Sequence, residues 1–200
     1  MNMNLEVVPY RSEWQEQFLD LGRRIRAAMQ SSALRIDHIG STAVHGLSAK
    51  PIIDVQLTVA SLAGQVMLSE QLAPLGLVAR GETREDRPPP WDVAEPREWQ
   101  KFYYRTKDGI YPRVHLHVRA SGRRNQRYPI LFRDYLRANN RARDAYGLFK
   151  QNLARFVGHL SNPGGTGPYL DMKDPVLDLI AESAERWAEL TSWRPGASDA

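Results

Sequence analysis

A turn of small residues and the strand after it carry the side chains in this sequence that are best suited to binding phosphate. Gly40-Ser41-Thr42 offers a flexible backbone, two hydroxyls and free amide groups, and successive amides in such a turn can form a concave anion site. Asp54 lies within residues 52–59, where apolar and polar residues alternate as in a half-buried strand. A phosphate-binding turn beside an acid on a strand is the minimal set of groups that holds a nucleotide and its metal ion.

Spacing excludes two common motifs at this turn. A Walker A loop needs G-x-x-x-x-G-K-[ST], whereas Gly40 and Gly46 are six positions apart and Lys50 lies four positions beyond Gly46. The nucleophile elbow of serine hydrolases needs G-x-S-x-G, but Gly40 directly precedes Ser41. The turn therefore predicts phosphate contact through Gly40, Ser41 and Thr42, and Lys50 is either a further phosphate contact or an exposed lysine before a strand.

A second polar group is expected on residues 113–119, the second strand of a hairpin. Alternation places Val114, Leu116 and Val118 on one face. The opposite face carries four cationic or titratable residues: Arg113, His115, His117 and Arg119. This pattern indicates anion or metal contact, although a solvated face of an antiparallel sheet gives the same pattern.

Several basic and aromatic residues later in the chain are candidates for a phosphate or base pocket. They are Arg133, Arg137, Tyr146, Lys150, Tyr169 and Lys173. The alternative is a buried polar network that ties helices together. Among them, we assign phosphate contact to Arg133, Lys150 and Lys173. His38 and His45 are weaker candidates, because one is expected at a strand edge and the other in a loop or at a helix end.

These residues are positioned by a predicted mixture of helices and strands. Helical periodicity is expected over residues 12–30, 61–72, 128–139 and 141–156, and over a last helix that begins at Asp174-Pro175. Strands are expected at residues 34–39, 52–59, 77–80, 99–106 and 113–119. Between residues 81 and 98 the chain is charged and proline-rich, which predicts a long loop that is either a flap over the site or an excursion.

Composition fits a single soluble domain. The 200 residues are 42% hydrophobic and 25% charged, without cysteine, which is ordinary for a globular protein and excludes disulfides and thiolate zinc sites. We expect one domain over residues 1–194 and a disordered tail over residues 195–200. The absence of a long apolar run or a leader sequence predicts a cytoplasmic protein without membrane contact. The net charge of +4 favours an anionic ligand.

The ordered motifs of the chain resemble those of the GrpB-like family. They include Pro9-Tyr10 with Trp14, residues 38–54, Val114-His115-Leu116-His117, residues 132–137, Tyr146 with Lys150, and Tyr169 with Lys173 before Trp187. This family is identified as a branch of the polymerase-β-type nucleotidyltransferase superfamily. The resemblance implies a small mixed α/β sheet flanked by helices, with a helical C-terminal part.

The resemblance also implies roles for individual residues. Superfamily members hold a nucleoside triphosphate at the Gly-Ser turn, and bind two divalent metals through an Asp-x-Asp pair and a third acid on a neighbouring strand. Asp54 matches the first acid, but Gln56 stands at the second position and His115 or His117 at the third. Asp54 and His117 are thus the candidate catalytic residues, and Asp54, His115 and His117 the candidate ligands of Mg²⁺ or Mn²⁺. Because a neutral glutamine is a poor ligand for hard cations, the two-metal chemistry is in question.

Three functions remain open from the sequence. The first is a nucleotide-binding protein that transfers a nucleoside monophosphate from a triphosphate to an acceptor. The second is a non-catalytic module of the same fold that binds a nucleotide or a phosphorylated metabolite. RNA binding is the third, and the absence of an arginine-rich tract or stacking motif counts against it.

Overall fold

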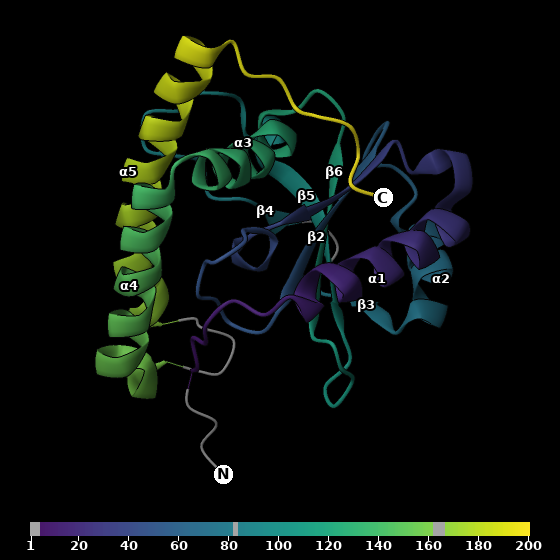
Figure 1. Ribbon diagram of the computed structural model, residues 1–200. Helices are drawn as coiled ribbons and strands as arrows, with labels where there is room; N and C mark the ends of the chain where they lie inside the picture. The colour runs from purple at the N-terminus through teal and green to yellow at the C-terminus, as the bar shows by residue number, and fades with distance from the viewer. Residues whose placement is uncertain (1–4, 82–83, 162–166) are drawn as a thin grey trace.

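A mixed sheet of six strands forms the centre of the computed structural model, which describes residues 5–81, 84–161 and 167–200. The strands are β1 (Arg35–Ile39), β2 (Ile53–Val59), β3 (Leu77–Ala79), β4 (Arg84–Glu85), β5 (Gln100–Thr106) and β6 (Val114–Ala120). Their order is β1-β2-β6-β5-β3, and β4 pairs with β5 (Figure 1). The expected fold, a mixed α/β sheet with flanking helices and a helical C-terminal part, is confirmed.

Helices cover both sides of the sheet. On one side lie α1 (Glu13–Met29) and α2 (Gln65–Leu72), and on the other lie α3 (Arg124–Ala138), α4 (Asn140–Val157) and α5 (Pro168–Thr191) (Figure 1). The main core includes the apolar stripe of α1 and the apolar faces of β2 and β6. Because these strands bury alternate residues under α1 and α2, their polar residues must face α3, α4 and α5. None of the helices in the described ranges combines the length and the apolar composition that a membrane crossing requires.

The pairing of β2 with β6 aligns the two strands that carry the candidate site residues. They run parallel, and the register places Asp54 opposite His115 and Gln56 opposite His117. The hairpin formed by β5 and β6 is antiparallel, as the sequence predicts. Side chains at paired positions share a face, so one carboxylate and two imidazoles meet on the same side of the sheet.

Two expectations for the C-terminal part are wrong. The last helix, α5, begins at Pro168, so that Asp174 and Pro175 lie inside it; Pro168 suits the first helical turn, where an amide hydrogen is not needed. Residues 195–200 are also not a free tail. Asp199 donates its amide to the carbonyl of Ile36 at 3.1 Å, and the hydroxyl of Ser198 accepts from the Ile36 amide at 2.8 Å. The tail covers the open edge of β1, whose backbone groups otherwise lack partners.

Candidate functional site

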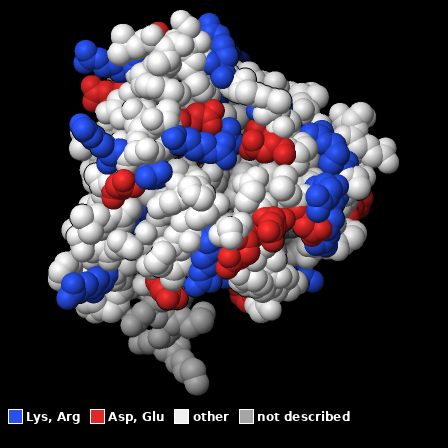
Figure 2. All heavy atoms as spheres, viewed as in Figure 1, with Lys and Arg blue, Asp and Glu red and all other residues white. Residues whose placement is uncertain are grey.

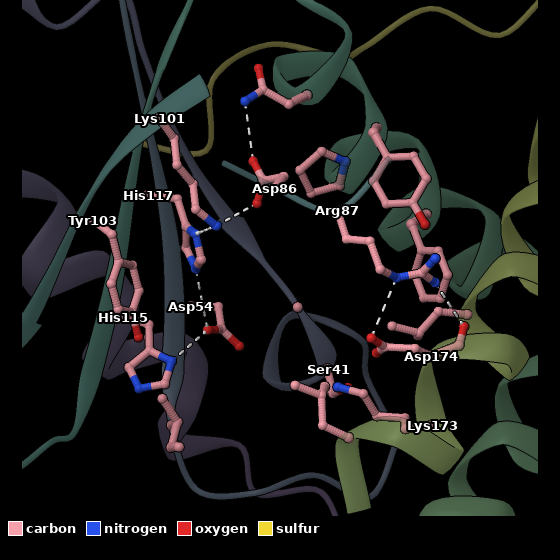
Figure 3. Close-up of a pocket in the computed structure, with 18 of the residues that line it drawn as sticks. Ser41, Asp54, Asp86, Arg87, Lys101, Tyr103, His115, His117, Lys173 and Asp174 are labelled. Atoms are coloured by element: carbon pink, nitrogen blue, oxygen red, sulfur yellow. Dashed lines mark hydrogen bonds and ion pairs between the residues drawn. The ribbon is translucent and has the colours of Figure 1, made fainter. Parts of the chain in front are cut away.

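A cleft of about 590 Å³ lies between the polar face of the sheet and helices α3, α4 and α5. Of the residues to which the sequence analysis assigns a catalytic, phosphate-binding or metal-binding role, all except Arg133 line it: Gly40, Ser41, Thr42, Lys50, Asp54, His115, His117, Lys150 and Lys173. Figure 3 shows Asp54 between His115 and His117 on one side and Ser41 and Lys173 on the other. The fold therefore brings the turn, the acid, the imidazoles and the lysines to one place.

Gly40 lets the turn approach the acid on β2. Its φ is +70°, in the region that favours glycine, and a Cβ at this position would collide with the carboxylate of Asp54. The residues after it, Ser41–Ala43, form one turn of 3-10 helix. Glycine is thus required both by the backbone conformation and by the space, and the expected contact between the turn and Asp54 is present.

Asp54 lies between two imidazoles. Its Oδ1 is 3.5 Å from Nδ1 of His115 and 3.8 Å from Nε2 of His117. Burial raises the pKa of Asp54, but interactions with His115 and His117 outweigh this effect and hold the pKa well below its usual range. The side chain is nevertheless 29% exposed, so a charged carboxylate faces the cleft.

His117 is held in one tautomer by Lys101. Its Nδ1 lies 3.1 Å from Nζ of Lys101, which also forms an ion pair with Asp86. An ammonium has donors only, so Nδ1 must accept and the hydrogen of the neutral ring must lie on Nε2, which faces Asp54. Burial, with Lys101 as the next cause, lowers the pKa of His117 to about 4. His117 therefore presents a donor to Asp54 rather than a lone pair.

Gln56 does not reach the cleft, although it shares a strand face with Asp54. It is fully buried, accepts from Nη1 of Arg119 at 2.7 Å and donates to the carbonyl of Gln126 at 2.8 Å. Arg119 in turn is paired with Asp86 at 2.8 Å. The position of the second acid is thus occupied by a neutral amide that is bound to a cation.

This donor set does not fit two divalent metals. In the described part of the chain, no group of three or more histidine, aspartate and glutamate side chains could hold a metal ion. Asp54 is a carboxylate ligand, and His115 lies beside it, but the tautomer of His117 turns a hydrogen toward the position of a cation. Lys101 and Arg119 add positive charge on the same side. The residues that could bind a single cation are therefore Asp54 and His115.

Three lysines from different elements converge on the other side of Asp54. Lys150 on α4 donates to Oγ of Ser41 at 2.7 Å, and its Nζ lies 4.4 Å from the centre of the Tyr146 ring. Burial lowers the pKa of Lys150 well below its ordinary value, and repulsion from Lys173 and Lys50 lowers it further. Burial, followed by repulsion from Lys173, lowers the pKa of Lys50 to about 8. The cluster is therefore a local excess of positive charge.

Comparison with known proteins identifies the family. The model described as GrpB protein matches residues 4–183. The chain belongs to the GrpB family. A crystal structure of GrpB from Enterococcus faecalis superimposes with a TM-score of 0.71 at 27% identity, over 91% of this chain and 99% of that one. The resemblance inferred from the motifs is thereby confirmed at the level of the family.

Curated relatives of this GrpB chain include both short and long proteins. A UPF0157 protein of Halalkalibacterium halodurans is 34% identical in an alignment of 187 positions that covers 92% of this chain and 84% of that protein. A dephospho-CoA kinase of Mycolicibacterium paratuberculosis is 30% identical in an alignment of 203 positions that covers 96% of this chain and 48% of the kinase. The chain thus spans about half the length of the mycobacterial relatives that it matches.

Asp86 is a site residue of this GrpB chain that the sequence did not reveal. Besides Lys101, its carboxylate binds Arg119 through both oxygens, at 2.8 and 2.9 Å, and Nδ2 of Asn125 at 3.1 Å. The next residue, Arg87, pairs with Asp178 on α5 at 2.6 Å. Residues 84–87 therefore cross from the sheet to α5 and line the cleft, as in the flap interpretation of the proline-rich loop. Asp86 directly follows β4, which pairs with β5, and no pattern in the sequence predicted that short strand.

Arg133 was predicted to contact phosphate, but it lies outside the cleft. It is buried on the side of α3 that packs against β1, donates to the carbonyl of His38 at 2.9 Å and pairs with Asp199 at 2.5 Å. Its guanidinium joins α3, β1 and the C-terminal residues. Arg133 therefore belongs to a buried polar network, which was the alternative interpretation of the sequence. His38 and His45 are also absent from the lining of the cleft; His38 stacks on Phe18 with 4.6 Å between ring centres.

Proposed function

We propose that the cleft binds a nucleotide and holds its phosphate groups at the Gly-Ser turn. The observation that carries this proposal is that Lys50, Lys150 and Lys173 line one cleft with Ser41, and that Lys150 donates to the hydroxyl of Ser41 at 2.7 Å. Charged donors that point into a shared space are the usual arrangement for phosphate oxygens. Burial, followed by repulsion between the lysines, lowers the pKa values of Lys50 and Lys150, and an anion bound beside them would offset both effects.

The remainder of the cleft suits a nucleoside. Its volume of about 590 Å³ falls within the range of small-molecule sites, about 300–1,000 Å³. Aromatic side chains line the walls: Trp99, Tyr103, Tyr128, Phe132, Tyr146 and Tyr169. A purine or pyrimidine ring can stack on such faces, since every base presents a π-surface.

Nucleotidyl transfer is the second candidate, and the position of Asp54 favours it. Asp54 lies in contact with the Gly40 turn, so its carboxylate would lie beside the bound phosphates. In the reaction, an acceptor oxygen bonds to the α-phosphorus, the bond from that phosphorus to the bridging oxygen breaks, and pyrophosphate leaves. Asp54 would hold Mg²⁺ or Mn²⁺, which would neutralise charge on the phosphates, and the acceptor's proton would pass to water, because the lowered pKa makes Asp54 a weak base.

The two other functions left open by the sequence are a non-catalytic sensor and an RNA-binding protein. A non-catalytic sensor of a nucleotide or phosphorylated metabolite would use the same cleft, and it is distinguished from a transferase only by turnover. RNA binding would require a continuous basic surface, whereas lysine, arginine, aspartate and glutamate are interspersed over the face in Figure 2. The cationic cluster lies inside the cleft instead.

A ligand panel tests the proposal. Thermal shift and calorimetry would compare ATP, AMP, dephospho-CoA and unphosphorylated adenosine, and the dephospho-CoA arm follows the name of the mycobacterial relatives. We expect the phosphorylated compounds to raise the melting temperature and adenosine to have little effect. Equal responses to adenosine and its phosphates would contradict a phosphate site. Release of pyrophosphate from ATP, lost in Asp54→Asn, would separate the transferase from the sensor.

A further inference from the structure

We propose that Lys50, Lys150 and Lys173 act as a built-in counter-charge, so that the ligand's polyphosphate binds as the free anion without a divalent cation. This inference rests on the proposed nucleotide site and adds the ionic form of the ligand. The three lysines come from the segment before β2, from α4 and from α5, and all of them line the cleft. A nucleoside triphosphate usually binds to proteins together with Mg²⁺. Binding of the metal-free anion would therefore distinguish this site from most nucleotide sites.

Lys150 is the most deeply buried of the three lysines. Only 3% of its surface is exposed, and its neighbours are a hydroxyl and an aromatic ring, those of Ser41 and Tyr146. Within the described ranges, neither Lys150 nor Lys173 forms an ion pair with a carboxylate. A buried ammonium is costly unless an anion compensates it. The cleft beside Lys150 and Lys173 is where such an anion would bind.

The charges on the other side of the cleft also favour a ligand that binds without a divalent cation. There the cations Lys101 and Arg119 share the single carboxylate of Asp86, so positive charge is left over, and neutral Gln56 stands where the resemblance implies a second acid. The negative charge needed to hold two divalent cations is missing, while positive charge is in excess beside Ser41. A cation bound to the phosphate chain would therefore be repelled by the lysines.

The ligand class follows from the number of positive groups. A monophosphate carries at most about two negative charges for three ammonium groups, whereas a di- or triphosphate carries more. We therefore expect affinity to rise from nucleoside monophosphate to triphosphate. Inorganic tripolyphosphate, which lacks the base, should compete with ATP.

Calorimetry of ATP binding, first in EDTA and then in excess Mg²⁺, tests the inference. ATP should bind in EDTA, and Mg²⁺ should weaken the binding by about 10-fold. Loss of one charge-assisted contact in Lys150→Met should weaken metal-free binding by about 10- to 100-fold. Lys107→Met is the matched control, because Lys107 is exposed in the β5–β6 turn and its loss should leave the affinity unchanged. Lys173→Met, on the partly exposed side of α5, replaces Lys150→Met if that variant does not fold.

The outcomes separate this inference from the function on which it rests. Binding of ATP only with Mg²⁺ would overturn the counter-charge role and leave the nucleotide site intact. Equal affinities for the wild type, Lys150→Met and Lys173→Met in EDTA would also overturn it. An absence of nucleotide binding under both conditions would overturn the proposed function together with the inference.

Discussion

The ammonium of Lys101 lies 3.1 Å from Nδ1 of His117, and this contact decides which ring nitrogen carries the hydrogen that faces Asp54. In Lys101→Met, Nδ1 loses its nearer donor and keeps only the longer contact with Nη2 of Arg119 at 3.5 Å, so the other tautomer becomes more accessible. The pKa of His117 should also rise from about 4 toward its ordinary value, because a nearby cation that lowers it is removed. Nitrogen NMR of the imidazoles over a pH series measures both effects.

The control for this variant is Lys107→Met, which should leave the resonances of His117 unchanged. If Lys101→Met has the wild-type tautomer and the wild-type pKa of His117, the lysine does not position the ring.

A second prediction concerns the space between Gly40 and Asp54. Gly40→Ala should destabilise the fold and weaken nucleotide binding, because the new Cβ would adopt a φ of +70° and meet the Asp54 carboxylate. Gly109→Ala is a matched control, since Gly109 has a φ of +82° with nothing within 4 Å of its Cβ position. Positive φ alone costs about 1–2 kcal/mol, so urea denaturation should show a larger loss for Gly40→Ala. Equal losses for the two variants would mean that the turn can move away from Asp54.

Ser41 and Asp54 should respond differently to substitution. Ser41→Ala should weaken nucleotide binding by about 0.5–1.5 kcal/mol with or without metal, because one hydrogen bond is lost. Asp54→Asn should preserve or improve metal-free binding, because it removes a negative charge beside the phosphates, and it should abolish any effect of Mg²⁺ or Mn²⁺ that acts through this carboxylate. Titrations of both variants in EDTA and in metal measure these effects. Equal losses that are insensitive to metal would assign Asp54 a structural role.

The stability of the ligand-free protein should rise above neutral pH. Burial lowers the pKa of Lys50 from 10.5 to about 8, so between these values the unfolded chain binds more protons than the folded one, and the free energy of unfolding increases with pH. Below about pH 8 both states are protonated, and the cost of burying the charge is fully present. Urea denaturation between pH 7 and 10 measures the rise, which Lys50→Met should reduce and saturating tripolyphosphate should flatten. An unchanged slope in both cases would contradict the repulsion between the lysines.

Local periodicity was sufficient to predict most of the fold. Alternation in residues 52–59 and 113–119 correctly placed Asp54, His115 and His117 on polar strand faces, and the turn at Gly40 was expected beside the acid on the strand. These features depend on side-chain direction along one element, which the sequence determines directly.

The remaining features depend on contacts between distant segments. Asp86 acts through Lys101, Arg119 and Asn125, and nothing in a proline-rich loop signals that its ends pair with β5. The helical pattern around Arg133 does not say whether that side of α3 meets the cleft or β1. The tail over residues 195–200 looks disordered by composition, yet it is held by the open edge of a strand far away in the sequence.

In the proposed complex, the phosphate groups of the nucleotide lie among Lys50, Lys150 and Lys173, beside Ser41. A crystal structure of the protein with ATP, prepared in EDTA, tests this arrangement most directly. We predict phosphate oxygens within hydrogen-bond distance of Nζ of Lys150 and Oγ of Ser41, with Lys50 and Lys173 on other oxygens of the triphosphate. Phosphates bound elsewhere, with the Lys150–Ser41 contact unchanged and the cleft without ligand, would contradict it.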